Sequence, residues 1–257
     1  MKLKIMTKKT LSIKEIDLIT RLEFEGKEIY TRKEINFFCA SRQKSAYLIK
    51  KLLEKKRLRK IIKNTYLFIP MKAPQGRWTG NEYLIAKALI NEAKYYIGYS
   101  SVFNSYGFTE QVAQMIHVVN DKYSIKKTVD GIRYKLIKVL PDRIYGLETR
   151  KISREDIVFA SKERALLDTF EFYNVKKASA ILTKQLKNID VAVFVDYVAR
   201  YPVQIIRRRI GFFLEKLDVS QKILNKINVG QKGYSFLYDT EAKIGKANKK
   251  WRIIING

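Results

Sequence analysis

A basic stretch with helical periodicity, from Ser41 to Lys63, carries the side chains best suited to bind a polyanion. It holds ten lysines and arginines and one acid, Glu54. At 100° per residue, its apolar side chains share one helix face with Ser45, and its polar and cationic side chains share the opposite face. A DNA major-groove helix requires this division. The alternative is a solvated surface helix, because lysine-rich faces commonly lie in water. The outer face comprises Gln43, Tyr47, Lys50 and Glu54, with Lys44 and Lys51 beside it.

Two helices are expected before this stretch. Residues 11–24 form the first, with Ile13, Ile16, Ile19 or Thr20, and Phe24 on its inward face, and Gly26 ends it. Residues 32–39 form the second, which a T-x-x-E capping box opens just upstream. Only two residues separate this second helix from the basic one, which predicts a helix-turn-helix.

A β-hairpin is expected after the basic helix. Residues 59–62 and 65–69 are rich in β-branched and aromatic side chains, and Lys63 and Asn64 form a two-residue turn between them. The order helix, helix, helix, hairpin is typical of a winged helix-turn-helix. Its basic wing tip, with Lys60, Lys63 and Asn64, would reach DNA phosphates or the minor groove. A plain structural hairpin is the alternative.

Charge supports a polyanionic partner. The 257-residue chain has a formal net charge of +27 and 46% hydrophobic residues, so it can also bury a core. Residues 1–72 carry +13 and residues 73–257 carry +14, so positive charge is more than twice as dense in the first segment. Proline and glycine cluster between Pro70 and Gly80, which predicts a domain boundary there. We therefore expect a winged helix-turn-helix domain over residues 1–72 and a second domain over residues 73–257.

The second domain is predicted to be mixed α/β and to end in a helical, bundle-like region, so that the whole chain is α+β. Strands are expected at residues 95–97, 115–119, 133–139, 157–159, 234–238 and 251–255. Helices are expected at residues 81–93, 100–106, 161–173, 175–186, 190–200, 203–217 and 220–228. Lys126–Lys127 and Asp130–Gly131 are interpreted as turns.

Residues for catalysis are few. The single cysteine, Cys39, and the single histidine, His117, are interpreted as packed residues and cannot together supply a metal site. Asp239, Glu241 and Lys243 form an acid-x-Lys pattern that a metal-dependent nuclease could use, and Asp168 and Glu171 lie one helical turn apart. We interpret Asp168 and Glu171 as acids that each pair with a nearby lysine or arginine. No catalytic residue, metal or cofactor is predicted, and we expect a protein that is not an enzyme.

Two further features bear on partners. Arg207, Arg208 and Arg209 head an apolar helix and are either a secondary basic surface for phosphate or an acidic partner, or a solvated face with one arginine buried against a carboxylate such as Glu215. The N-terminus has no apolar signal segment, and no stretch has the roughly 20 apolar residues of a membrane span. We expect a cytoplasmic protein without a membrane partner.

Five segments together resemble the antitoxins of AbiE-type abortive-infection systems, a type IV toxin–antitoxin class used in phage defence. After the winged helix, which ends in NTYLFIP, the matching segments occur in the family's order. They are YYIGYSSVFNSYGFTEQV (residues 95–112), SKERALLD (161–168), RRRIGFFLE (207–215) and WRIIIN (251–256). Each motif is moderately specific, and the resemblance depends on their joint order.

The resemblance implies a winged helix that binds inverted repeats at the protein's own promoter and represses the operon. It implies a second domain that counters a nucleotidyltransferase-like toxin. The DNA-binding role then falls on Arg42, Gln43, Lys44, Tyr47, Lys50, Lys51, Lys60, Lys63 and Asn64. Gln43 would read an adenine edge, while the cations hold phosphates. The basic second domain leaves an RNA-binding module that protects a toxin's target as an alternative, and a nuclease as a further one.

Overall fold

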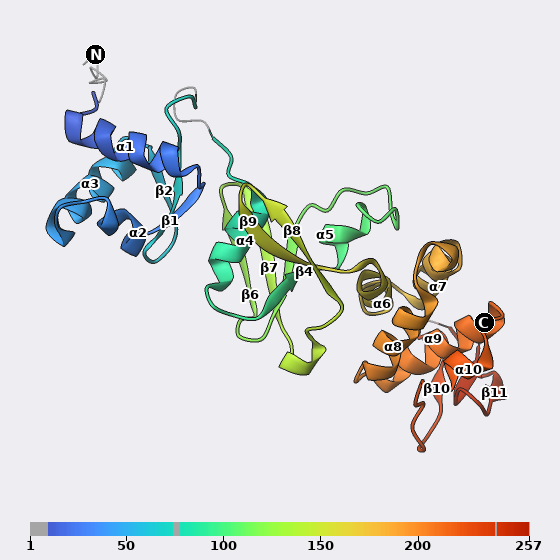
Figure 1. The fold of residues 1–257 in the computed structure, drawn as a ribbon. Coiled ribbons are helices and arrows are strands. Elements are labelled where there is room, and N and C mark those ends of the chain that lie inside the picture. Colours follow the sequence, from blue (N-terminus) through green and yellow to red (C-terminus); the bar gives the residue numbers. More distant parts are fainter. Residues whose placement is uncertain (1–9, 74–77, 240, 257) are drawn as a thin grey trace, which may run out of the picture. The chain divides into compact units, whose positions relative to one another are not determined.

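The structure is a computed structural model, and it describes residues 10–73, 78–239 and 241–256 (Figure 1). Contacts divide the chain into two compact units. The first holds the described residues up to Glu92, together with Lys127–Arg133 and Arg150–Ile157, and the second holds the remaining ones. All winged-helix elements lie in the first unit. The predicted boundary at residues 72 and 73 stays a prediction, and residues 74–77 of the expected linker lie outside the described residues.

The first unit contains a winged helix-turn-helix. Its elements in chain order are α1 (Ile13–Glu25), β1 (Ile29–Thr31), α2 (Arg32–Phe37), α3 (Arg42–Glu54), β2 (Leu58–Ile62) and β3 (Thr65–Phe68). The strands form an antiparallel sheet in the order β1-β3-β2. The three helices and the two wing strands match the sequence-based predictions, and the expected capping box of Thr31 and Glu34 opens α2. Helix α4 (Glu82–Ile90) follows, capped by Asn81.

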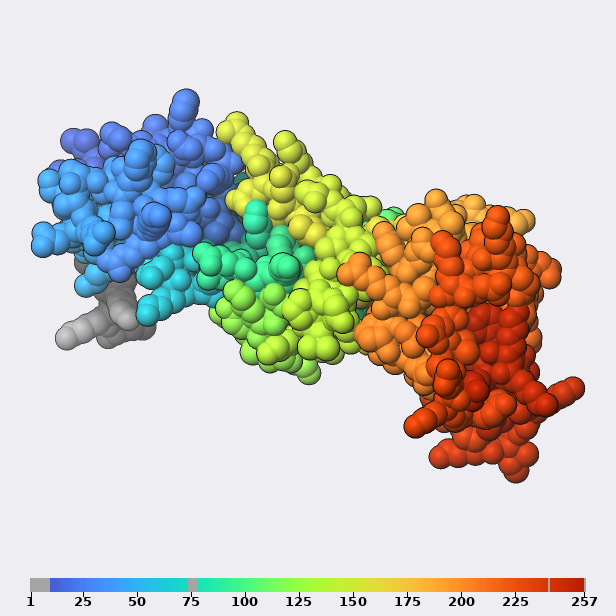
Figure 2. Space-filling model, turned by 60° about the horizontal axis from the view of Figure 1, so that its bottom comes forward, coloured from blue at the N-terminus to red at the C-terminus, as the bar shows by residue number. Residues whose placement is uncertain are grey.

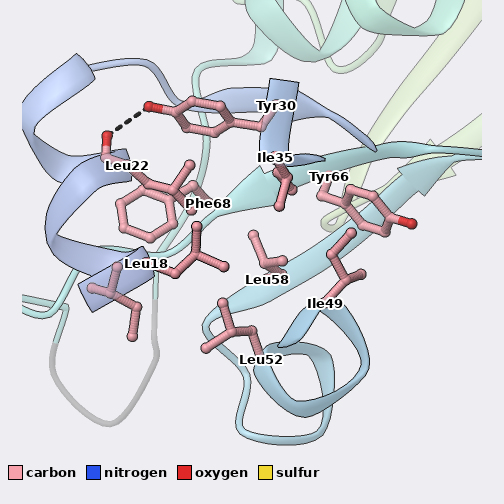
Figure 3. Packing of buried hydrophobic residues seen from close by; sticks show 10 residues of the cluster. Leu18, Leu22, Tyr30, Ile35, Ile49, Leu52, Leu58, Tyr66 and Phe68 are labelled. Carbon is pink, nitrogen blue, oxygen red and sulfur yellow. Dashed lines mark hydrogen bonds between the residues drawn. The ribbon is translucent and has the colours of Figure 1, made fainter. Parts of the chain in front are cut away.

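One apolar cluster holds these elements together (Figure 3). Leu18 and Leu22 of α1 pack with Ile49 and Leu52 of α3 and with side chains from all three strands. The Tyr30 hydroxyl donates to the Leu22 carbonyl at 2.6 Å, so this buried phenol has a partner. Burial raises the pKa of Tyr30 to about 12. The cluster fixes α3 against α1 and the wing strands.

Helix α1 packs through a face that shares only Ile19 with the predicted one. The buried residues are Glu15, Leu18, Ile19 and Leu22, whereas Ile13, Ile16 and Phe24 are exposed. Both faces carry apolar side chains, and the acid Glu15 made the true inner face look polar. Lys55 pairs with Glu15 at 2.6 Å. Although burial acts to raise it, hydrogen bonds from Lys55 and Ser12 lower the pKa of Glu15, so a charged carboxylate is accommodated inside.

A six-stranded mixed sheet has the order β6-β7-β5-β4-β9-β8. Its strands are β4 (Tyr95–Ile97), β5 (Ile116–Asn120), β6 (Ile125–Val129), β7 (Ile132–Lys138), β8 (Leu147–Ile152) and β9 (Glu155–Ala160). Strand β6 replaces the turn predicted at Lys126–Lys127, and β8 was not predicted. The turn at Asp130–Gly131 is confirmed, with φ of 56° and 80°. The short helix α5 (Ser100–Phe103) follows β4.

Helices dominate the chain after β9. They are α6 (Lys162–Phe172), α7 (Val175–Gln185), α8 (Val191–Arg200), α9 (Gln204–Lys216) and α10 (Gln221–Leu224). A small sheet of β10 (Ser235–Phe236), β12 (Ile253–Ile255) and β11 (Lys246–Asn248) ends the described chain, and β11 was not predicted. The fold is therefore α+β, as predicted. None of the helices within the described ranges has the length and apolar character to span a membrane.

Candidate nucleic-acid interface

The two helices of the helix-turn-helix are tied together by a buried serine. Ser45 of α3 is fully buried, and its hydroxyl hydrogen-bonds to Asn36 of α2 and to the Arg42 carbonyl. At the start of α3, the Ser41 hydroxyl accepts from the Lys44 backbone N–H at 3.2 Å. These bonds fix the angle at which α3 leaves the turn. The orientation of its outer face is thereby set before any ligand arrives.

The outer face of α3 is open. Arg42, Gln43, Lys44 and Lys50 are exposed, and Tyr47 is 61% exposed. None of these three cations forms an ion pair with any part of the chain that the structure describes. The outer-face residues Gln43, Lys44, Tyr47 and Lys50 therefore share one accessible surface, and Arg42 is exposed at the start of the helix. Its mixture of an amide, a phenol and unpaired cations suits both base edges and phosphates.

Several cations of the basic stretch are already engaged within the protein. Lys51 pairs with Glu54 at 3.1 Å, and Lys55 pairs with Glu15. Arg57 donates to the Pro70 carbonyl, and Arg59 pairs with Asp130 at the β6–β7 turn. Fewer cations of this stretch are therefore available to a ligand than the number of its basic residues suggests. Sequence alone could not show this, because three of the four partners lie at least thirteen residues away.

The wing presents its tip to solvent. Lys60, Lys63 and Asn64 are exposed, and Asn64 has a left-handed φ of 60°, which asparagine tolerates. The Asn64 carbonyl accepts from the Arg32 backbone N–H at 2.7 Å, which ties the wing turn to the start of α2. The pairing of β2 with β3 shifts register between Lys60 and Ile62. The wing tip is therefore bonded to α2, the same helix to which Ser45 ties α3.

A hollow of about 490 Å³ lies between α1 and the start of α3. Gln43, Lys44 and Tyr47 line it, together with the side chain of Cys39. Burial raises the pKa of the Cys39 thiol, which is half-buried against the apolar cluster as its sequence context predicted. The outer face of α3 is therefore concave near its N-terminal half.

The arginine triplet of α9 does not form the candidate secondary basic surface. Arg208 is 2% exposed and donates to the carbonyls of Val229 and Lys232, and Arg209 is buried and pairs with Asp239. Arg207 is half-buried and donates to a backbone carbonyl. Arg208 and Arg209 are therefore buried and bonded within the protein, and they link α9 to the segment between Val229 and Asp239. The expected burial against a carboxylate occurs, with Asp239 in place of Glu215.

The acid-x-Lys pattern is likewise used in ion pairs. Asp239 pairs with Arg209, and Glu241 pairs with Lys176, while Thr240 between them lies outside the described residues. Across the described ranges, no three His, Cys, Asp or Glu side chains come together as a metal site requires. Asp239 and Glu241 are therefore each engaged by a basic side chain.

A buried polar network lies in the second unit. Arg164 of α6 donates to Asp168 at 2.9 Å and to the Tyr96 hydroxyl at 2.7 Å, and Tyr145 stacks under its guanidinium. Burial raises the pKa of Asp168 to about 6, against the pull of Arg164. Although burial acts to lower it, the facing Asp168 raises the pKa of Arg164. Both groups are therefore ionised at neutral pH.

A second ion pair adjoins this network. Arg143 pairs with Glu171 at 2.6 Å, and the Tyr99 hydroxyl donates to the other Glu171 oxygen at 2.6 Å. The sequence-based interpretation of Asp168 and Glu171 as ion-pair partners is confirmed. The partners of Glu171 come from distant segments, which no local spacing could reveal. The charges of this network are paired with one another inside the unit, so the exposed α3 face is the stronger candidate site.

Comparisons with known proteins support the fold only. No protein-family model matches the sequence, and no curated protein matches it. The fold is similar to the crystal structure of the RV2827C protein from Mycobacterium tuberculosis, with a TM-score of 0.64 at 12% sequence identity. The match covers 95% of this chain and 92% of that one. The likeness therefore extends over both units of the α+β fold.

Proposed function

We propose that this protein is a DNA-binding antitoxin that represses its own toxin–antitoxin operon. The observation that carries the DNA-binding part is the open α3 face. There Gln43 and Tyr47 lie beside the unpaired cations Lys44 and Lys50, with Arg42 exposed at the start of the same helix, which the winged-helix core fixes. A double-stranded promoter site with inverted repeats is the proposed ligand.

The contacts divide into two kinds. Gln43 reads a base edge from α3, since a glutamine amide matches the N6 and N7 atoms of adenine. Arg42, Lys44 and Lys50 neutralise phosphates beside it, and the wing-tip lysines reach the flanking backbone. Lys51 contributes less to phosphate binding, because Glu54 already pairs with it. Lys50 is therefore the stronger phosphate contact of the adjacent pair.

The antitoxin part rests on the order of the five sequence motifs that resemble AbiE-type antitoxins. In this proposal, residues 73–257 counter a nucleotidyltransferase-like toxin encoded beside this gene. Co-expression with the neighbouring gene tests it. Relief of the growth arrest that the neighbour causes would support the proposal, and unrelieved arrest by a toxic neighbour would contradict it.

Two classes of α3 variant test the DNA-binding part. Gln43→Ala should relax sequence preference in a selection from random duplexes, with little change in salt dependence. Lys44→Ala with Lys50→Ala should weaken binding to all duplexes and lower the log–log salt slope by about one per lost phosphate contact. The matched control replaces two exposed lysines of the second unit, Lys184→Ala with Lys222→Ala. An equal effect of this control would contradict the assignment to α3.

RNA binding is the second candidate function. The observation that favours it is the net charge of +14 over residues 73–257, which a promoter-binding winged helix alone does not require. Competition between structured RNA and duplex at matched salt separates the two functions. A preference for the RNA would favour a module that shields a toxin's target.

A further inference from the structure

Helix α1 leaves an apolar stripe uncovered on the winged-helix unit. Ile13 is 86% exposed and Phe24 is 87% exposed, with Ile16 and Thr20 also exposed between them. Their spacing of three and four residues places them on one helix face. Figure 2 draws the described residues of this N-terminal segment as blue spheres. Single exposed apolar residues are ordinary, but an aligned stripe along a whole helix marks an interaction surface.

The charges beside this stripe are self-complementary. Along one flank of α1 the exposed charged residues are Lys14, Asp17, Arg21 and Glu25. Reversing the helix about a point near residue 19 exchanges Lys14 with Glu25 and Asp17 with Arg21, so each charge meets its opposite. The same reversal brings Ile13 opposite Phe24 in the stripe. This is the pattern that an isologous contact needs, because both partners then use the same surface.

We propose that α1 pairs antiparallel with α1 of a second copy of this chain. A two-fold axis perpendicular to both helices brings their equivalent flanks together. Lys14 then faces Glu25 of the second copy. Asp17, which pairs with Arg21 of its own chain in the monomer, pairs instead with Arg21 of the second copy. Ile13 packs on Phe24 of the second copy and closes the apolar stripe.

The size of the surface sets when the pair forms. A helix of 13 residues is about 20 Å long, and two such helices bury less than the roughly 800 Å² per partner of a standard interface. Association is therefore weak in free solution. It becomes effective when two copies occupy adjacent inverted half-sites, because the DNA raises their local concentration. This last step rests on the proposed DNA-binding function, whereas the pairing itself does not.

Engineered cysteines test the pairing geometry. In a Cys39→Ser background, Thr20→Cys places two thiols near the axis and within disulfide reach, whereas Ile13→Cys separates them by about 18 Å along the helices. We expect mild oxidation at high protein concentration, with and without duplex, to give a covalent dimer from Thr20→Cys alone. Equal cross-linking of both variants, or none from either, would overturn the proposal.

Reversing the charges at Lys14 and Glu25 tests the role of the α1–α1 pairing on DNA. Lys14→Glu and Glu25→Lys should each lower the ratio of two-site to one-site duplex affinity by about tenfold, and the double variant, with the original net charge, should restore it. Ile13→Asp should lower the same ratio, and Ile244→Asp, at an isoleucine 85% exposed in the second unit, should not. Failure of the double variant to recover the ratio would overturn the pairing.

The two proposals fail separately. If the wild-type protein binds no duplex, the DNA-binding function fails, and the cross-linking pattern still decides the pairing. If one-site binding is intact but two-site binding shows no cooperativity and Thr20→Cys does not cross-link, only the pairing fails. Cross-linking to a different protein in place of a second copy would likewise overturn it.

Discussion

At the residue scale, Arg164 shows how the second unit tolerates charge in its interior. Its guanidinium is 1% exposed, yet Asp168, the Tyr96 hydroxyl and two backbone carbonyls accept from it. A buried charge costs several kcal/mol unless it is paired and hydrogen-bonded. The motif SKERALLD therefore has a structural meaning: its arginine and aspartate, one helical turn apart, form a neutralised pair that anchors α6.

Breaking this pair should destabilise the protein strongly. Asp168→Asn leaves the Arg164 charge buried without its counter-ion, and we expect a loss of about 3–5 kcal/mol in the free energy of unfolding. Denaturant titration followed by tryptophan fluorescence measures it. The control is Asp196→Asn at the exposed pair with Lys226, where at most about 1 kcal/mol is expected. Similar losses in the two variants would contradict the account.

His117 should make the protein sensitive to acid. Burial, with Lys135 nearby, lowers the pKa of its imidazole to about 4, and its ring contacts Phe172. An unfolded chain takes up this proton near pH 6.5, so the neutral histidine's contribution is present above that pH. It is lost as pH falls towards 4, by up to about 3 kcal/mol.

The variant His117→Asn should flatten this part of the stability profile. The difference in unfolding free energy between wild type and variant, measured from pH 7 to pH 4, isolates the histidine, because carboxyl groups such as Asp168 titrate in both proteins. A difference that does not change with pH over this window would contradict the assignment.

At the element scale, two sequence motifs near the C-terminus form one packing unit. A Cβ atom at Gly211 of α9 would overlap the Trp251 ring, and the Trp251 indole N–H donates to Glu215 of the same helix at 2.6 Å. RRRIGFFLE and WRIIIN therefore occur together because each completes the other's packing. The Trp251 ring occupies the space that any side chain at position 211 would need, so this contact requires glycine there.

Gly211→Ala should accordingly cost more than an ordinary glycine replacement. Overpacking against Trp251 is expected to remove about 2–3 kcal/mol of stability. Gly233→Ala is the control, because open space surrounds that position and only its left-handed φ of 64° is penalised, by about 1–2 kcal/mol. Thermal unfolding of both variants provides the comparison. A cost at Gly211 no larger than at Gly233 would refute the packing account.

Sequence predicted most elements because their local signals agree with the fold. Caps at Thr31, Ser41 and Ser161 mark helix starts that the structure confirms. Predictions failed where a distant partner decides the outcome. The inner face of α1 depends on Lys55, forty residues from Glu15. The lysine-rich strand β6 lies at a sheet edge, where lysine is common and apolar alternation is weak.

At the scale of the whole molecule, the same limit applies to the candidate site. Periodicity predicted the outer face of α3, since exposure there follows helix geometry alone. It could not predict which cations are neutralised, because Glu15, Asp130 and Asp239 reach their partners through tertiary structure. The surface that remains for the proposed DNA contact comprises the outer face of α3 and the wing tip, in a chain of net charge +27.

The central claim is that α3 and the wing bind duplex DNA specifically. The most direct measurement is a salt-series binding titration against the duplex upstream of the protein's own gene, with scrambled duplex and structured RNA as competitors. The account predicts specific duplex binding that weakens steeply with salt, and a slope that Lys50→Ala with Lys51→Ala lowers by between one and two. Equal binding to all three nucleic acids, with an unchanged slope in the variant, would contradict it.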